Sequence, residues 1–353
     1  MPLYYRLDGT TPEGRRTAAG LLRLREQMKV IPPKDISNTL LLATWNIREF
    51  DSAKYGPRLD EACYYLAEVI SYFDLVAIQE VRDDLKPLQK LRGLLGSWWG
   101  YLVTDVTAGV AGNQERLAFV FDERKVRLAG VAGEVVIPPI KQGNKEVAPA
   151  HQLARTPYLC GFKAGWSGFN LCTVHIVYGE SKPDDRARVE EIRALCQFLA
   201  ARAKKDAGRE ENLIILGDFN IFSRKDATME QITAAGFQVP KELQELKGSN
   251  VGRDKHYDQI AFMVNEKMLG FTGRAGVLDF YESVFRTPDE ADYLGIARQN
   301  QLQAKPKKQL PEGKWPGKGY LDWRTYQMSD HLPMWVQLKI DFCNEYLQRR
   351  AGT

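Results

Sequence analysis

The chain has 353 residues, of which 44% are hydrophobic and 27% are charged, and this composition excludes a disordered or fibrous protein. Its net charge of +4 excludes a polycation such as a histone, although it allows a local phosphate-binding face. The length alone suggests about two domains, but a large α/β sandwich can also fold as one unit of this size.

Targeting and redox signals are few. The N-terminus has no apolar segment of the kind found in secretory signals, and no run of 18 apolar residues occurs, so we expect no membrane span. The odd number of cysteines and the lack of a CxxC pair predict reduced thiols in a cytoplasmic protein and argue against a cysteine zinc site. These are Cys63, Cys160, Cys172, Cys196 and Cys343.

The first 38 residues are predicted to form a helical appendage. Thr11 can cap a helix with Pro12 at its first position, and Pro32 and Pro33 end it. From residue 39 onwards, apolar runs of strand length alternate with apolar residues at helical spacing, which is typical of an α/β fold. We predict strands at 40–45, 75–78, 117–121, 159–162, 169–176, 213–216, 260–264 and 334–338, and helices at 59–73, 85–95 and 192–199.

One segment, residues 286–327, breaks this alternation because it carries turn residues, lysines and little apolar periodicity. Residues 298–318 contain six basic residues and one acidic residue, so this stretch has a net charge of +5 and the rest of the chain carries −1. Two interpretations are open: a solvated basic insertion, or a flexible arm that contacts phosphates. Residues 342–353 are predicted to form a C-terminal tail.

Polar side chains follow three of the buried strands. Asn46 ends the first, Glu80 the second, and Asp218 with Asn220 the strand at 213–216. In α/β sheets ligands bind beyond the carboxyl ends of the strands. Three oxygen-bearing residues at three such ends therefore predict a functional site there.

Two histidines join this set, because His175 ends a strand and His331 follows Asp330 just before the last one. Oxygen donors such as Asn46, Glu80 and Asp330 suit Mg²⁺ or Mn²⁺ better than zinc. Histidines and an aspartate could activate water or stabilise a pentavalent phosphorus. The pattern indicates metal-assisted phosphoester hydrolysis, and GxSxG, HExxH and P-loop motifs are absent from the sequence.

These residues lie in five short motifs that resemble, in order, those of the endonuclease/exonuclease/phosphatase superfamily, also called deoxyribonuclease I-like. The resemblance implies a four-layer α/β/β/α sandwich with two packed mixed β-sheets, and it extends over residues 39–341. The motifs are Thr44-Trp45-Asn46-Ile47, Ile78-Gln79-Glu80-Val81, Gly217-Asp218-Phe219-Asn220, Tyr257-Asp258-Gln259-Ile260 and Ser329-Asp330-His331-Leu332-Pro333.

The resemblance also implies residue roles. Glu80 would be the principal metal ligand for Mg²⁺ or Mn²⁺, with Asn46 beside it and Asp330 as a candidate second ligand. Asp218 and Asn220 would position the water and the scissile phosphate.

Two histidine–carboxylate pairs are implied as well. His331 would pair with Asp258, and His175 with Glu115. The general base is left open between Asp218 and His331.

Arginines are implied to bind the substrate. Arg155 resembles the phosphate-contacting arginine of the family. Arg82, in Gln79-Glu80-Val81-Arg82-Asp83, resembles an arginine that enters the DNA minor groove, and the alternative is a surface charge paired with a neighbouring aspartate. Asn113 stands where deoxyribonuclease I has a groove-stacking tyrosine, and Arg48 departs from the aspartate of abasic-site endonucleases.

Three hypotheses follow. The first is a metal-dependent DNA endonuclease of low sequence specificity. The second is a phosphatase or phosphodiesterase of the same fold that acts on small lipid or sugar phosphoesters. The third, an inactive binding module, is disfavoured because every matched site position is filled.

Overall fold

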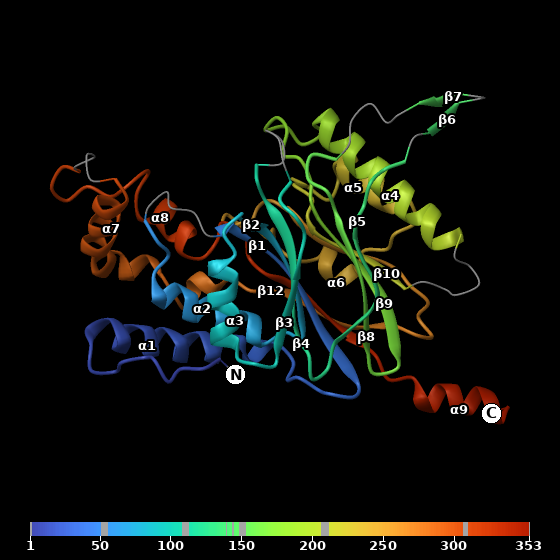
Figure 1. Cartoon of the computed structure of the whole chain (residues 1–353), viewed down its shortest axis with the longest axis horizontal. Helices are drawn as coiled ribbons and strands as arrows, with labels where there is room; N and C mark the ends of the chain where they lie inside the picture. Colours follow the sequence, from blue (N-terminus) through green and yellow to red (C-terminus); the bar gives the residue numbers. More distant parts are fainter. Residues whose placement is uncertain are drawn as a thin grey trace.

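Two mixed β-sheets form the centre of the molecule (Figure 1). The computed structural model describes residues 2–50, 56–107, 113–138, 140–142, 145–147, 153–205, 212–305 and 310–352. In order across the sheets, one has strands β12-β13-β1-β2-β4-β3 and the other β11-β10-β9-β8-β5, while β6 and β7 pair separately. This confirms the predicted α/β fold with two packed mixed sheets.

The strands of the first sheet are β1 (Thr39–Phe50), β2 (Leu75–Val81), β3 (Trp99–Val103), β4 (Arg116–Asp122), β12 (Gly270–Val277) and β13 (Met334–Lys339). Those of the second are β5 (Arg127–Glu134), β8 (Tyr158–Ala164), β9 (Ser167–His175), β10 (Leu213–Asp218) and β11 (Asp258–Met263). The separate pair is β6 (Ile140–Gln142) and β7 (Lys145–Val147).

The α-helices are α1 (Pro12–Gln27), α2 (Asp60–Ser71), α3 (Lys86–Leu95), α4 (Arg186–Lys205), α5 (Ala227–Ala234), α6 (Lys241–Gln244), α7 (Glu290–Ala304), α8 (Tyr320–Gln327) and α9 (Cys343–Ala351). Short 3-10 turns lie at Met28–Val30, Phe280–Glu282 and Thr287–Asp289.

Alternation along β1 shows why the fold has layers. Leu40 and Leu42 belong to the core between the sheets, which extends to α4 and α5. Leu41, Ala43 and Trp45 belong to a second core, under α1, α2, α3 and α8, which we call the helix-side core. Successive side chains of a strand point to opposite faces. Since both faces of β1 are buried, its sequence is a continuous apolar run rather than an alternating one.

The predicted N-terminal helix packs against α2 and begins at its predicted cap, where the Thr11 hydroxyl accepts from the Gly14 N–H at 3.0 Å. Leu24 is fully buried in the helix-side core. Arg16 bonds to Glu61 of α2 at 2.7 Å, and Glu61 also accepts from the hydroxyl of Tyr293 of α7 at 2.7 Å. A buried polar network therefore joins α1, α2 and α7.

The structure corrects the expectation that residues 286–327 have little regular structure, because α7 and α8 occupy more than half of this segment. The interpretation of residues 298–318 as a solvated insertion or as an arm that contacts phosphates stays a prediction. Tyr293 of α7 and Tyr320 and Trp323 of α8 are buried in the helix-side core, so their burial supplied the order that the weak apolar periodicity did not predict. Lys305 follows the end of α7, while Lys307 and Lys308 lie outside the described residues.

The structure can be compared with the expectations about disulfides and membrane spans. The five cysteines all lie in the described part of the chain and form no disulfide there, and four of them are buried. Across the described ranges, none of the helices combines the length and apolarity needed to cross a bilayer. The cytoplasmic location stays a prediction.

Candidate active site

Strand register brings the predicted side chains to one edge of the two sheets. β1 and β2 are parallel, with Asn46 opposite Gln79, so Glu80 follows directly beyond the pair. β9 and β10 are also parallel, with His175 opposite Asp218. The carboxyl ends of both strand pairs therefore meet, as the strand-end argument predicted.

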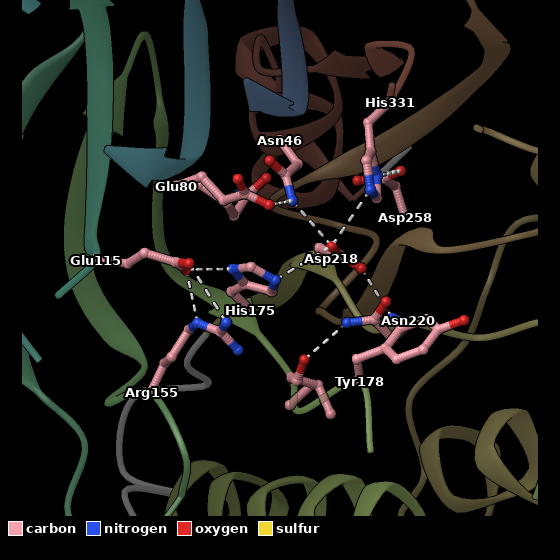
Figure 2. Close-up of polar contacts among 12 residues, drawn as sticks. Asn46, Glu80, Glu115, Arg155, His175, Tyr178, Asp218, Asn220, Asp258 and His331 are labelled. Atoms are coloured by element: carbon pink, nitrogen blue, oxygen red, sulfur yellow. Dashed lines mark hydrogen bonds and ion pairs between the residues drawn. The ribbon is translucent and has the colours of Figure 1, made fainter. Parts of the chain in front are cut away.

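Asn46 is the bridge between the sheets at this edge. Its amide Nδ2 donates to Oε1 of Glu80 at 2.9 Å and to Oδ2 of Asp218 at 3.0 Å (Figure 2). Behind it, the buried Gln79 amide donates to the hydroxyls of Thr44 at 3.1 Å and Thr173 at 2.9 Å. The Asn46–Asp218 and Gln79–Thr173 bonds therefore join the two sheets at the site.

His175 lies between two carboxylates, as Figure 2 shows. Its Nδ1 is 2.8 Å from Glu115 Oε2 and its Nε2 is 3.4 Å from Asp218 Oδ2. Burial and Arg155 lower the pKa of His175, but the two carboxylates outweigh them, so the pKa is raised above its ordinary value.

Glu115 anchors this side of the site. Arg155 Nε bonds to its Oε2 at 2.6 Å, and Asn113 Nδ2 donates to its Oε1 at 2.6 Å. Burial alone would raise the pKa of Glu115, but the His175 and Arg155 charges outweigh it and lower this pKa to about 2. Glu115 is therefore a fixed anion that orients both cations.

His331 forms the second pair. Its Nδ1 is 2.9 Å from Asp258 Oδ2, and its Nε2 is 3.6 Å from the same Asp218 oxygen that His175 approaches. Burial lowers the pKa of His331, but Asp258 and Asp218 outweigh burial and raise it well above its ordinary value. Two imidazolium-forming side chains thus converge on one carboxylate.

Unusual backbone conformations position the strand ends. Gly217 has φ +138°, and a Cβ built there would lie 2.2 Å from the Val174 carbonyl oxygen, so only glycine fits before Asp218. Asn220 has φ +53°, its N–H donates to Asp218 Oδ1 at 2.8 Å, and its Nδ2 donates to the Ile176 carbonyl at 2.8 Å. The β9 and β10 ends are therefore locked together.

The donor set fits a hard divalent cation. Asn46 Oδ1 is buried and has no hydrogen-bond partner among the described residues, and it sits on the same side chain that contacts Glu80. Burial, with the nearby Glu115 and Asp330 charges, raises the pKa of Glu80, so a cation would relieve an unfavourable charge. Within the described ranges no cluster of three His, Cys, Asp or Glu side chains could hold a metal, which is compatible with Mg²⁺ because that ion commonly uses one or two carboxylates plus substrate oxygens.

Asp330 and Arg82 have partners that sequence reasoning missed. The Asp330 carboxylate is 43% exposed and lies 3.5 Å from Arg48. The Arg48 guanidinium also lies 3.9 Å from the centroid of the Tyr326 ring in α8.

Arg82 donates to the Asn113 carbonyl at 3.1 Å and lies 3.9 Å from Glu115, rather than pairing with a neighbouring aspartate. No short-range sequence signal links these partners, because each pair joins different elements.

Comparison with known proteins identifies the family. A sequence model of the endonuclease/exonuclease/phosphatase family matches residues 43–232, more than half of the chain, so the chain belongs to this family. It accordingly has the deoxyribonuclease I-like fold of this family, as the resemblance implied.

Among individual proteins, one named deoxyribonuclease from Thioalkalivibrio sp. (strain K90mix) is 28% identical over 198 residues, which is 54% of this chain and 49% of that protein. The chain thus matches about half the length of that relative. Two similar solved structures are D. rerio TDP2 complexed with single-strand DNA product (TM-score 0.52, 13% identity, 85% of this chain and 98% of that one) and the mannosyl-6-phosphatase Bt3783 of Bacteroides thetaiotaomicron VPI-5482 (TM-score 0.51, 16% identity, 86% and 99%).

Proposed function

We propose that the protein is a divalent-metal-dependent phosphodiesterase that cleaves DNA endonucleolytically with low sequence specificity. The observation that carries the proposal is the convergence of two histidine–carboxylate pairs on Asp218 beside the Asn46–Glu80 pair. This combination suits phosphodiester hydrolysis, because the reaction is assisted by a base for the attacking water and by positive charge around the phosphoryl oxygens, which gain negative charge.

In the proposed reaction, water attacks phosphorus, the water–phosphorus bond forms and the bond to the leaving oxygen breaks. Asp218 accepts the proton of the attacking water, because its carboxylate is held by the Asn46 amide and by the Asn220 N–H. His175 and His331, whose protonated forms are favoured by their carboxylate partners, donate to the oxygens of the phosphoryl group. The leaving oxygen takes a proton from solvent and departs as an alcohol, while Asp218 releases to solvent the proton that it accepted.

A bound Mg²⁺ or Mn²⁺ would polarise a phosphoryl oxygen. Glu80 and Asn46 would hold it, with Asp330 as a further candidate ligand. Arg155, oriented by Glu115, supplies a guanidinium suited to a phosphate oxygen.

The choice of DNA as substrate is supported by three observations. The curated relative bears the name deoxyribonuclease, and D. rerio TDP2, which shares the fold, was crystallised with a single-strand DNA product. The chain also concentrates its excess positive charge in residues 298–318, which suits a polyanion. A mannosyl-6-phosphatase has the same fold, so small phosphoesters are the alternative that an experiment must distinguish.

Nicking of supercoiled plasmid tests the proposal. Purified protein is incubated with Mg²⁺, Mn²⁺ or EDTA, beside Asp218→Asn and a matched control, Asp292→Asn, which changes an exposed aspartate of α7. We expect metal-dependent conversion to open circles by the wild type and the control. Asp218→Asn should be slower by about 10²–10⁴-fold, the usual contribution of an acid–base group.

The opposite outcome would redirect the assignment. If a folded protein that binds Mg²⁺ by calorimetry leaves both the plasmid and a single-stranded oligonucleotide intact, DNA cleavage is wrong and a panel of sugar and lipid phosphoesters becomes the substrate screen. If Asp218→Asn nicks at the wild-type rate, Asp218 does not belong to the catalytic set.

A further inference from the structure

A group of aromatic side chains, which we call the aromatic rim, borders the catalytic residues. It consists of Tyr178, Phe222 and Tyr257. The Tyr178 and Phe222 ring centroids are 5.8 Å apart, those of Phe222 and Tyr257 are 5.7 Å apart, and Tyr257 lies 5.3 Å from the His331 ring. The rim therefore continues from a catalytic imidazole to the surface.

Tyr178 is the surface member of the rim. Phe222 is 6% exposed, whereas Tyr178 is 41% exposed. Figure 2 shows Tyr178 beside Asn220. The Asn220 amide donates to the carbonyl of Ile176, which precedes Tyr178 by two residues. Tyr178 is thus a half-exposed aromatic residue at the edge of the candidate phosphate-binding region.

This exposed ring is held in place by the structure beneath it. The buried guanidinium of Arg188 donates to the Tyr178 carbonyl, with Nε at 3.1 Å, and to the Lys182 and Glu180 carbonyls at 3.1 and 3.0 Å. The Tyr178 hydroxyl bonds to the Ser181 hydroxyl at 3.1 Å. A fixed ring loses little freedom when a ligand covers it, so it is well suited to binding.

A positive charge accompanies the rim. Lys255 Nζ lies 4.8 Å from the centroid of the Phe222 ring, and the Lys255 side chain is 35% exposed. Aromatic surfaces interleaved with cations are the pattern by which proteins hold unpaired nucleotides, because the base stacks while the cation contacts the backbone. A sugar phosphate lacks the flat π-face that such a ring would cover.

We propose that Tyr178 stacks on a nucleobase next to the scissile phosphate, and that the substrate class is consequently DNA with at least one unpaired base at the cleavage site. The inference rests on the proposed function and deepens it by naming the strand state. In an intact duplex the base faces are already stacked on their neighbours, so the ring can engage a base only in a single strand, a frayed end or a locally opened duplex. Stacking on one aromatic side chain contributes a factor of about 10–100 in affinity.

The test uses short single-stranded oligonucleotides in which one phosphodiester is cleavable and the other linkages resist nucleases. One oligonucleotide carries normal bases, and two others replace the nucleotide on one or the other side of the cleavable bond by an abasic analogue. Rates are compared for the wild type, Tyr178→Ala, Tyr178→Phe and a matched control, Tyr5→Ala, whose tyrosine is 75% exposed.

For the wild type and Tyr5→Ala, we expect removal of one flanking base to lower kcat/KM by about 10–100-fold. Tyr178→Phe keeps the ring and should retain this preference. Tyr178→Ala should lose the preference on the base-containing substrate while cleaving the abasic substrate as fast as the wild type. A variant that merely disturbed the fold would slow all three substrates together.

Failure of this inference and failure of the proposed function give different results. If the wild type cleaves these oligonucleotides and Tyr178→Ala keeps the full base preference, the stacking role is wrong and the nuclease assignment stands. If the wild type nicks the plasmid but cleaves none of these oligonucleotides, the unpaired-base inference is wrong, and if it cleaves neither substrate, the nuclease assignment is wrong. Stacking is then judged from fluorescence-anisotropy binding of the same oligonucleotides to the wild type and Tyr178→Ala in EDTA, and equal binding of base-containing and abasic strands overturns it.

Discussion

Replacing Glu115 by glutamine should lower the free energy of unfolding by about 3 kcal/mol at pH 7. The magnitude follows from the pKa of Glu115, which the folded protein lowers from 4.5 to about 2, because each unit corresponds to about 1.36 kcal/mol. The carboxylate is 2% exposed, so solvent screens its interactions little. Glutamine resembles the protonated carboxyl and removes the charge while nearly keeping the shape.

The pH dependence of this difference follows from the direction of the shift. A depressed folded-state pKa contributes stability that is present above the unfolded-state value and is lost as the pH falls towards the folded-state value. The difference between wild type and Glu115→Gln should therefore fall from about 3 kcal/mol at pH 7 to roughly 1.5 kcal/mol at pH 3. Below about pH 2 it should vanish.

Urea unfolding at pH 7, 5, 4 and 3, in EDTA and followed by tryptophan fluorescence, measures this difference. Glu123→Gln is the matched control, since its carboxylate lies at an exposed position and should show little change at any pH. A difference below 1 kcal/mol at pH 7, or one that does not vary with pH, would refute the reasoning that Glu115 is a fixed anion held by His175 and Arg155.

Three further predictions concern metal, backbone and charge. Glu80→Gln should raise the Mg²⁺ concentration needed for half-maximal cleavage at least tenfold without unfolding the protein, and a metal titration of activity that gives an unchanged midpoint would remove Glu80 from the ligand set. Gly217→Ala should destabilise the fold by about 2 kcal/mol or more, because its Cβ would lie 2.2 Å from a carbonyl oxygen in a backbone conformation of φ +138°; chemical denaturation measures this, and near-native stability would contradict it. Neutralising three lysines of the basic segment should weaken DNA binding and lower the slope of log affinity against log salt by up to about 3 for duplex DNA, whereas an unchanged slope would mean that they do not contact phosphates. These lysines are Lys305, Lys307 and Lys308.

The sequence alone determined the position of the edge that carries the candidate site. Strands buried on both faces must be continuous apolar runs, so the polar residue that ends each run marks its carboxyl end. Asn46, Glu80 and Asp218 could be found in this way, and parallel pairing of β1 with β2 and of β9 with β10 then brings such ends together. The helix at the N-terminus was equally predictable, because a capping threonine followed by proline acts locally.

Only the tertiary structure decided which side chains form hydrogen bonds, ion pairs or ring contacts with one another. Glu115 is 60 positions from His175 in the sequence, and Arg48 is far from Asp330, so these pairs form only when the sheets and α8 pack. The helices α7 and α8 were missed for the same reason, because their order depends on distant partners rather than on periodicity. Tyr293 of α7 contacts α1 and α2, and Trp323 of α8 packs on Tyr293 and Phe285. Local patterns specify what each strand end carries, whereas contacts between distant segments depend on how the layers are packed, and the electrostatics of the site comes from those contacts.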